Sequence, residues 1–440
     1  MQRRTFIKKS TLTAISVGLL GVIQWNGKST MTSKTLKVNG QRIASRIAEL
    51  AKFGRDEKGH GYRVAFTQGD IEGRAWFIDL MRKAGLDTSI DAAGNIIGKR
   101  KGKNSSFKPI AFGSHIDMVP DGGNYDGTLG SIAALEIIEI LNENKIITEH
   151  PLEVIVFANE EGGTIGSSAM VGRFTRDDLQ RKSQSGLIMA EGIKAIGGNP
   201  DNIESCIRKK GDIHSWLELH IEQGGILENE NIQIGIVEGI VSMQDWNVTV
   251  EGFANHAGAT PMNLRKDALL SASKLAIAVN ETINSIQGRQ VGTIGKIKAY
   301  PGASNVIPGK VELSLEIRDL SVEKVNSLFA EIQKKADAIA KADNTKISFE
   351  KEFNLPPALT NERLRLKIKE SVQQLNLSSK LMQSGPYHDS AQMNLITPIA
   401  MIFVPSIGGI SHSHDEFTKA EDMTNGANVL LSTVLMVDKE

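Results

Sequence analysis

Residues 113–130 read GSHIDMVPDGGNYDGTLG and set a histidine and two aspartates among glycines, directly after the apolar run Pro109–Phe112. A solvated loop could have this composition, and so could the floor of a metal site. Three more apolar runs end in a similar way: VIVFAN before the pair Glu160-Glu161, WLEL before His220, and IAMIFVPSIGGIS before His412. Imidazoles mixed with carboxylates suit zinc or a neighbouring divalent ion, and a carboxylate shared by two ions builds a paired hydrolytic site. The recurrence favours a metal site.

The elements that must position these residues have the pattern of an α/β domain. Between residues 39 and 241, short apolar runs such as IAFG and LEVIVFA alternate with helical patterns such as SIAALEIIEIL. Continuous apolar strands between helices indicate a sheet that is covered on both faces. Ligand sites in such domains form outside the carboxyl ends of the strands, so the four runs should bring their polar residues to one edge.

A different pattern occupies residues 242–354. It begins with an alternating strand at Trp246, Val248 and Val250 and continues as helix, strand, strand, helix and strand, which is the βαββαβ order of a ferredoxin-like unit. After Leu355 the chain returns to a helix and to the buried run IAMIFV. We therefore expect a catalytic domain made of residues 39–241 and 355–440, with the smaller domain inserted. The later elements of the insert are a helix at 265–286, the strand GTIGKIKAY, an alternating strand at 311–317, a helix at 322–342 and the strand TKISFEKEF.

Composition agrees with two soluble domains. The chain has 440 residues, more than one core usually holds, with 40% apolar and 23% charged residues. Seven of its 51 basic residues and none of its 51 acidic residues lie in residues 1–37, so the remaining chain is net acidic. Such a body offers no surface for a polyanion, and nucleic acid is not an expected partner. Cys206 is the only cysteine, which excludes an intrachain disulfide.

The N-terminus resembles an export signal. MQRRTFIKKS is followed by the thirteen uncharged residues TLTAISVGLLGVI, a core too short to span a bilayer comfortably. Arg3 and Arg4, followed by Phe6 and Lys8, resemble the twin-arginine signal. We therefore expect residues 1–30 to be read by the twin-arginine export machinery and the protein to be periplasmic or exported. A frayed basic tail is the alternative, and the cleavage point and an uncleaved anchor stay open.

The motifs taken together resemble a known family. GSHIDMV with YDGTLG, NEEGG, LHIEQG, NHAGATPMNLRKDAL, SNVIPG, EIRD, YHDSAQM and GISH occur in this order. They resemble the N-carbamoyl-L-amino acid hydrolase and allantoate amidohydrolase group of the zinc-dependent aminoacylase and glutamate carboxypeptidase superfamily. The resemblance implies a catalytic domain with a binuclear metal centre and a ferredoxin-like lid that forms a homodimer. It also implies hydrolysis of a ureido or amide C–N bond in a small ureido acid.

The resemblance also implies a ligand set. His115 and His220 would bind one ion, Glu161 and His412 the other, and Asp126 would bridge the two. Zn²⁺ is the expected ion, with Mn²⁺, Co²⁺ or Ni²⁺ as alternatives. The position of His220 is acidic in the peptidase relatives, so a histidine there favours the carbamoylase branch. His412 is preferred to its neighbour His414 because it follows Ile410-Ser411, as in the family, and His60, His214 and His414 are read as ordinary histidines.

Catalytic and substrate-binding roles follow from the same resemblance. Asp117 would orient His115 through its carboxylate, and Glu160 would be the general base. Arg318 would hold the substrate carboxylate with its guanidinium fork, unless it simply pairs with a neighbour on the lid surface. The remaining residues would contact polar groups of the substrate or the developing oxyanion, His256 across the dimer: Gln223, Asn305, His256 and His388.

Two departures from the family pattern lie beside the proposed site. Gly-Gly-Thr-Ile follows the glutamate pair where Gly-Ser-Arg-Phe is common, and Gly-Pro-Tyr precedes His388 where Gly-Ala-Gly is usual. Neither removes a ligand, but both leave the substrate open. Two other readings stay in view: a dipeptidase or aminoacylase, which His220 disfavours, and an exported binding protein without turnover, which would be expected to lose the base or a ligand.

Overall fold

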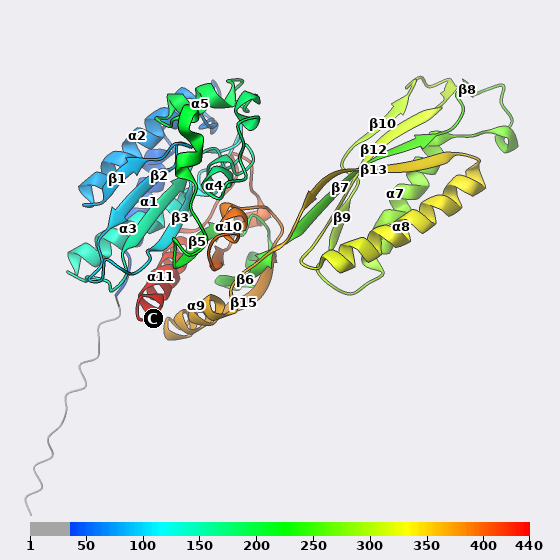
Figure 1. The fold of residues 1–440 in the computed structure, drawn as a ribbon. Coiled ribbons are helices and arrows are strands. Elements are labelled where there is room, and N and C mark those ends of the chain that lie inside the picture. The colour runs from blue at the N-terminus through cyan, green and yellow to red at the C-terminus, as the bar shows by residue number, and fades with distance from the viewer. Residues whose placement is uncertain (1–35) are drawn as a thin grey trace, which may run out of the picture. The chain divides into compact units, whose positions relative to one another are not determined.

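The structure is a computed structural model and describes residues 36–440, so the expected signal segment, residues 1–30, lies outside the described residues. A nine-stranded mixed sheet forms the larger domain (Figure 1). Its order is β1-β2-β4-β3-β5-β16-β6-β14, and β15 pairs with β6. The strands are β1 (Asp87–Ile90), β2 (Ile96–Arg100), β3 (Ile110–His115), β4 (Leu152–Phe157), β5 (Ser215–Ile221), β6 (Ile234–Ile240), β14 (Ala358–Leu359), β15 (Ser379–Ser384) and β16 (Ile399–Val404).

The four central strands, β4, β3, β5 and β16, run parallel to one another. All their residues are buried, as the continuous apolar runs predict. Their registers pair His115 with Phe157 and His220 with Phe403. The carboxyl ends of β3 and β4 therefore lie together, and so do those of β5 and β16.

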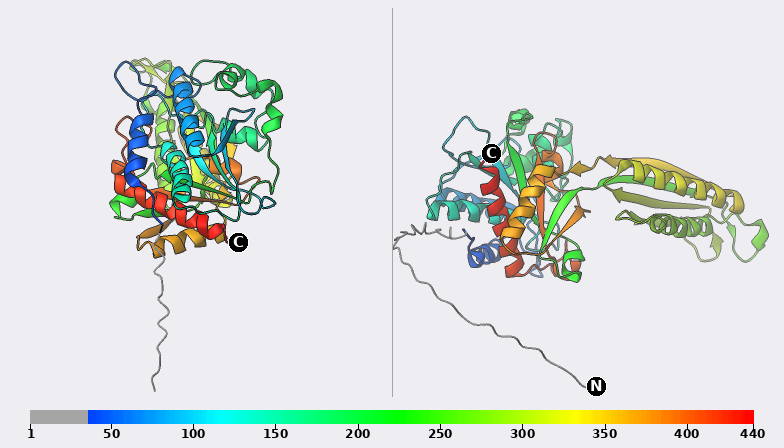
Figure 2. Two further views of the ribbon diagram at one scale, coloured as in Figure 1. Left: turned by 90° about the vertical axis from the view of Figure 1, so that its left-hand side faces the viewer. Right: turned by 90° about the horizontal axis from the view of Figure 1, so that it is seen from below.

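Helices cover both faces of this sheet. Helices α3, α9 and α11 pack on one face, with α1 against α3 and α11, and α10 packs on the other face beside α4. Figure 2 shows the red α11 beside the gold α9. The bounds are α1 (Gly40–Leu50), α2 (Gln68–Lys83), α3 (Thr128–Glu143), α4 (Ile165–Met170), α5 (Met189–Ala195), α6 (Ile226–Asn229), α9 (Glu362–Gln374), α10 (Asp389–Met393) and α11 (Ala420–Val437). Among the described residues, no helix is both long and apolar enough to cross a membrane.

Residues of β5 contact helices on both faces of the sheet. Trp216 and Glu218 face α10, where the Trp216 indole N–H donates to the Ser390 hydroxyl over 2.9 Å. Leu219 faces the other side, where α3 and α11 approach so closely that a Cβ on Gly130 would lie 2.2 Å from the Leu219 carbonyl oxygen. Since side chains alternate along a strand, His220 shares the face of Trp216 and Glu218.

The smaller domain is a five-stranded sheet with two long helices, and β7 begins at Ser242 while β13 ends at Leu355. The strand order is β10-β12-β7-β13, with β9 also paired to β12. Together with the mixed sheet, it confirms the predicted α/β class with an inserted ferredoxin-like unit. Its elements are β7 (Ser242–Glu251), β8 (Asn255–His256), α7 (Ala268–Asn284), β9 (Val291–Thr293), β10 (Ile297–Tyr300), β11 (Val306–Ile307), β12 (Lys310–Asp319), α8 (Val322–Asp343) and β13 (Lys346–Leu355).

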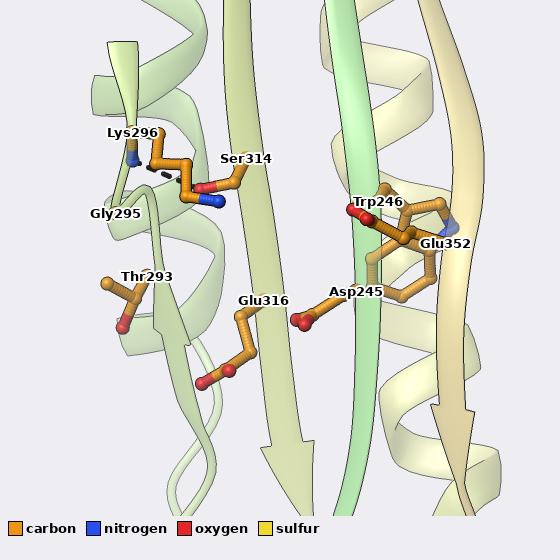
Figure 3. A pocket seen from close by; sticks show the side chains of 8 residues that line it. All are labelled: Asp245, Trp246, Thr293, Gly295, Lys296, Ser314, Glu316 and Glu352. Carbon is orange, nitrogen blue, oxygen red and sulfur yellow. Dashed lines mark hydrogen bonds between the residues drawn. The ribbon is translucent and has the colours of Figure 1, made fainter. Parts of the chain in front are cut away.

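One element of the smaller domain differs from its prediction. GTIGKIKAY was expected as a single strand, but it forms the two short strands β9 and β10, both paired with β12. The interruption falls at residues 294–296, where the Lys296 backbone N–H donates to the Ser314 hydroxyl over 3.0 Å instead of to a carbonyl on β12 (Figure 3). A side-chain hydroxyl here replaces one step of the ladder, which the hydrophobic pattern does not reveal.

The two faces of the smaller sheet have different characters. Leu313, Leu315 and Ile317 on β12 are buried in a core with α7 and α8. The opposite face carries polar side chains around a depression of about 260 Å³, to which β12 contributes Ser314 and Glu316 (Figure 3). Residues that line it on the other strands and turns are Asp245, Trp246, Thr293, Gly295, Lys296 and Glu352.

Candidate metal centre

The strand ends named by the sequence do meet at one edge of the mixed sheet. His115 is the last residue of β3, and His220 is the last but one of β5. Glu161 lies four residues beyond β4, and His412 lies eight residues beyond β16. Their side chains surround Asp126, which precedes α3 and is almost completely buried. We call these five residues, His115, Asp126, Glu161, His220 and His412, the Asp126 group.

The two oxygens of the Asp126 carboxylate face different partners. Oδ1 lies 3.5 Å from His115 Nε2 and 3.1 Å from His220 Nε2. Oδ2 lies 3.4 Å from His412 Nε2, and that nitrogen is also 3.3 Å from Glu161 Oε2. Ligand atoms of His115, Asp126 and His220 lie within 4.8 Å of one another. The same holds for Asp126, Glu161 and His412. Two potential ion sites therefore share one carboxylate, with one oxygen for each.

This donor set fits a pair of divalent ions. Each group offers imidazole nitrogen and carboxylate oxygen, which together suit zinc and the neighbouring transition ions. The ring nitrogen that faces away from Asp126 is occupied in both buried histidines. His115 Nδ1 lies 3.1 Å from the Asp117 backbone carbonyl, and His220 Nδ1 lies 2.9 Å from the Ile221 carbonyl. These contacts direct Nε2 of each ring toward Asp126 as the ligand atom, and in His220 this nitrogen also accepts the Gly127 N–H over 3.1 Å.

Burial and neighbouring charges shift the pKa values of the side chains around Asp126. Burial opposes the charge on Asp126, but the neighbouring His220, His115 and His412 outweigh it and hold the Asp126 pKa well below its usual range. The hydrogen bond to Asp126 raises the pKa of His412 to about 9. Burial, followed by repulsion from Asp126, raises the pKa of Glu161 to about 8. Divalent ions would relieve that repulsion, because they bring positive charge between the carboxylates.

Asp117 makes a different contact from the one expected. Its carboxylate was expected to orient His115, but the nearest carboxylate oxygen is 3.8 Å from Nδ1, and the backbone carbonyl makes the closer contact. The carboxylate instead accepts hydrogen bonds from the backbone N–H groups of Glu160, at 3.2 Å, and Glu161, at 3.1 Å. Asp117 therefore positions the loop that carries both glutamates, as well as one histidine.

Glu160 is buried beside the group, with Oε2 3.7 Å from His115 Nε2. Burial raises its pKa well above the usual range, and the nearby carboxylates of Asp389, Glu161 and Asp126 add to this effect against the attraction of His115. A carboxylate in such surroundings takes up a proton readily, which is what a general base requires.

Two of the predicted substrate-binding residues lie within the group. The Gln223 side-chain amide donates to Asp126 Oδ2 over 2.6 Å, so in this state it binds a candidate ligand. The buried His388 ring lies with its centroid 4.4 Å from that of His220, and its Nε2 is 2.9 Å from the Ser384 hydroxyl. Burial, followed by repulsion from His220, lowers the pKa of His388 well below its usual range, so its ring is neutral.

The other three lie on the smaller domain. Arg318, at the end of β12, donates to both carboxylate oxygens of Glu316, over 2.6 and 2.9 Å, and to the Gly385 carbonyl over 2.8 Å. His256 and Asn305 come together at the opposite end of that strand: His256 pairs with Val306, and the Ala257 N–H donates to the Asn305 carbonyl. Both are exposed, and within residues 36–440 neither makes a hydrogen bond or ion pair with the Asp126 group.

Sequence reasoning missed Glu416, which ties two loops of the site together. Its Oε1 accepts the backbone N–H groups of Tyr125, at 2.9 Å, and Asp126, at 3.0 Å. Its Oε2 accepts the Ser411 hydroxyl over 2.7 Å, next to His412. A glutamate in a polar loop gives no pattern from which its contacts with Tyr125 and Asp126, 291 and 290 residues away, could be predicted.

Comparison with known proteins agrees with this geometry. A family model described as Peptidase family M20/M25/M40 matches residues 111–436. The chain belongs to this family. The N-carbamoyl-L-amino acid amidohydrolase of Geobacillus stearothermophilus is 38% identical to this M20 family protein over 402 residues, covering 90% of this chain and 98% of that one. The ureidoglycolate hydrolase of Arabidopsis thaliana is 36% identical over 415 residues, covering 91% and 87%.

Solved structures place the M20 family protein in a narrower group. The crystal structure of an amidase of the hydantoinase/carbamoylase family from Burkholderia multivorans matches with a TM-score of 0.87 and 33% identity. The match covers 92% of this chain and 99% of that one. The predicted membership of the carbamoylase-type amidases is therefore confirmed.

Proposed function

We propose that this chain is a metal-dependent amidohydrolase that cleaves a ureido or carbamoyl C–N bond in a small ureido acid. N-carbamoyl-L-amino acids, allantoate and ureidoglycolate represent the substrate class. The observation that carries the proposal is the Asp126 carboxylate, which presents one oxygen to His115 and His220 and the other to His412. A carboxylate divided in this way is built to bridge two ions, and bridged ions are a common device of hydrolysis.

His115, His220 and Asp126 would hold one ion, and Asp126, Glu161 and His412 the other, with Zn²⁺ as the expected metal. Such ions would polarise the scissile carbonyl and make water more acidic. Glu160 would accept the proton of the attacking water and deliver it to the departing amine. The side chain is suited to both steps, because burial and neighbouring carboxylates make its protonated form stable.

Arg318 would select the substrate by its carboxylate. Its guanidinium already binds the Glu316 carboxylate with two parallel hydrogen bonds, which is the fork geometry that a substrate carboxylate would need. Glu316 would therefore compete with the substrate for the same face of Arg318. This pairing is also the lid-surface alternative, so the two readings differ in whether Glu316 gives way.

A homodimer through the smaller domain would complete the site. Strand β12 has ten residues, so its two ends lie about 30 Å apart at ~3.4 Å per residue. Arg318 is at the end that adjoins the larger domain, whereas His256 belongs to the other end. His256 of the partner subunit would meet the developing oxyanion, since a side chain so far along the strand needs a second chain to reach a site.

Export is proposed from the N-terminal sequence alone. Replacing Arg3→Lys and Arg4→Lys together should leave the protein in the cytoplasm if the twin-arginine route carries it to the periplasm. Unchanged fractionation of the double variant would count against this route.

The reaction can be tested by one substrate panel. Metal-loaded protein would be assayed for release of ammonia or amine from N-carbamoyl amino acids, allantoate, ureidoglycolate, N-acetyl amino acids and dipeptides. We expect turnover of one or more ureido acids. Turnover confined to N-acetyl amino acids or dipeptides would favour an aminoacylase or dipeptidase, and no turnover with any compound would favour a binding protein.

A further inference from the structure

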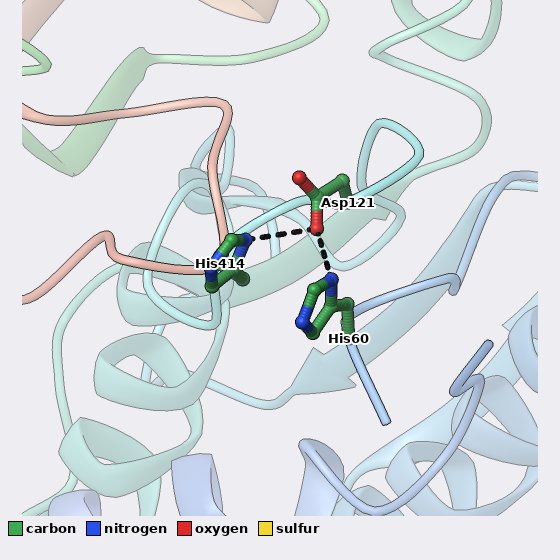
Figure 4. A group of neighbouring side chains, drawn as sticks. All are labelled: His60, Asp121 and His414. Carbon is green, nitrogen blue, oxygen red and sulfur yellow. Dashed lines mark hydrogen bonds and ion pairs between the residues drawn. The ribbon is translucent and has the colours of Figure 1, made fainter. Parts of the chain in front are cut away.

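A second group of metal-ligand side chains lies on loops outside the Asp126 group. His60, Asp121 and His414 have ligand atoms within 4.8 Å of one another (Figure 4). Asp121 Oδ1 lies 2.7 Å from His60 Nδ1 and 3.0 Å from His414 Nδ1. The two imidazole rings stack with centroids 4.0 Å apart and planes 11° from parallel. Both rings therefore present the same nitrogen to one carboxylate oxygen.

The backbone around this group is fixed by several independent contacts. Gly61 forms a β-bridge with Gly122, and a Cβ on Gly61 would lie 2.3 Å from the Gly122 carbonyl oxygen, so only glycine allows this approach. The His60 N–H donates to Asp56 Oδ1 over 2.8 Å, which fixes the turn that carries the ring. Asp121 itself has a φ of 60°, in the left-handed region that few residue types adopt.

We propose that His60, Asp121 and His414 form a third cation site, for Zn²⁺ or a similar divalent transition-metal ion, with water completing the coordination. Two imidazoles and one carboxylate are a common ligand set for such ions. Bonds of 2.0–2.1 Å around a tetrahedral ion place its ligand atoms about 3.3 Å apart. The 2.7 and 3.0 Å contacts are close to this value, so an ion could enter after a small outward movement of Asp121.

The third site lies where a bound ion would hold two loops of the Asp126 group together. His414 shares its loop with His412, and Asp121 shares its loop with Asp126. An ion at the third site would join these two loops to each other and to the turn at His60, outside the tie that Glu416 already makes. The site binds no substrate in this proposal, and its existence does not depend on the reaction proposed above.

The test is the number of ions bound by matched variants. Wild-type protein, His414→Asn, Asp121→Asn and the control His214→Asn would be dialysed to equilibrium against buffered Zn²⁺ and measured by elemental analysis. Asparagine tolerates the left-handed backbone at position 121, so Asp121→Asn removes the charge without new strain. We expect wild type and His214→Asn to hold one ion per chain more than His414→Asn or Asp121→Asn.

A second arm separates the third site from the Asp126 group. His220→Asn should lose an ion from that group, and adding His414→Asn should remove one further ion. A Zn²⁺ titration followed by thermal melting should show a larger stabilisation of His220→Asn than of the double variant, which keeps only the ion of Asp126, Glu161 and His412. Equal zinc content in wild type, Asp121→Asn and His414→Asn would overturn the proposal and leave the three side chains as a hydrogen-bonded group.

Discussion

Glu160 meets two demands on a general base at once, since it lies beside the candidate ligands and its protonated form is favoured by burial. Replacement by glutamine keeps the size of the side chain and removes its ability to accept a proton. We expect Glu160→Gln to lower kcat by at least ~100-fold while the metal content stays the same. Steady-state kinetics and elemental analysis of the same sample test this. Glu49→Gln, an exposed glutamate on α1, is the control, and near-normal turnover of Glu160→Gln would exclude the role.

Glu416 should act on the metal through the backbone of Asp126 and the hydroxyl of Ser411. Glu416 accepts hydrogen bonds from the Tyr125 and Asp126 N–H groups and from the Ser411 hydroxyl. Because alanine removes all three, we expect Glu416→Ala to weaken metal binding about 10–100-fold. Glutamine retains an acceptor oxygen for the two N–H groups, so Glu416→Gln should recover most of the affinity. Competition with a chromophoric chelator measures both. Equal affinities in wild type and Glu416→Ala would show that the loops are held by other contacts.

The residue scale also shows how far sequence reasoning reaches. His115, His220 and the glutamate pair could be located because each lies at or just beyond the end of a strand whose apolar run is plain in the sequence. The contacts of Asp117 could not, because they are made to backbone N–H groups whose position depends on the loop conformation. The same holds for His60, Asp121 and His414: the bridge between Gly61 and Gly122 joins the first two loops, and His414 meets them only through Asp121.

At the scale of elements, period-two alternation located Arg318 well. Leu313, Leu315 and Ile317 are buried against α7 and α8, and Arg318 shares the polar face with Glu316, as alternation predicts. Alternation failed for GTIGKIKAY, because residues 294–296 stand opposite only two residues of β12, Ser314 and Leu315, and this extra residue interrupts the pairing. A strand's faces are therefore readable from its apolar residues, whereas its breaks depend on the neighbouring strand.

The role of Arg318 can be tested together with its neighbour. Arg318→Lys keeps the charge but loses the fork, so we expect a higher KM with a smaller change in kcat. Replacing the substrate carboxylate by an amide should penalise wild type far more than this variant, since both changes remove one interaction. Glu316→Gln should lower KM, because the competing carboxylate is gone. Additive penalties and an unchanged KM in Glu316→Gln would leave Arg318 as part of the lid surface.

At the scale of the whole molecule, metal ions should contribute to folding as well as to catalysis. The candidate ligands come from positions 115 to 412, so a bound ion would connect segments that are far apart in the chain. Each ion bound at a hundredfold excess over its Kd would stabilise the folded state by about 2.7 kcal/mol. We expect chelation to abolish activity and lower Tm, and added Zn²⁺ to restore both. Active, dialysed enzyme without bound metal would contradict the metal centre.

The proposed homodimer would decide which chain supplies His256. Glu160→Gln and His256→Ala should each be nearly inactive alone. In a mixed dimer, the chain with His256→Ala keeps its own Glu160 and receives His256 of the partner subunit, so one of the two sites is complete. Subunits exchanged at equal amounts should therefore recover about a quarter of wild-type activity, since half of the dimers are mixed. Mixing Glu160→Gln with His412→Ala is the matched control, because both changes disable the chain that carries them and no dimer holds a complete site. Recovery in the first mixture alone would assign His256 to the partner's site, whereas no recovery in either would mean that His256 acts within its own chain. Near-normal activity of His256→Ala alone would mean that His256 has no catalytic role.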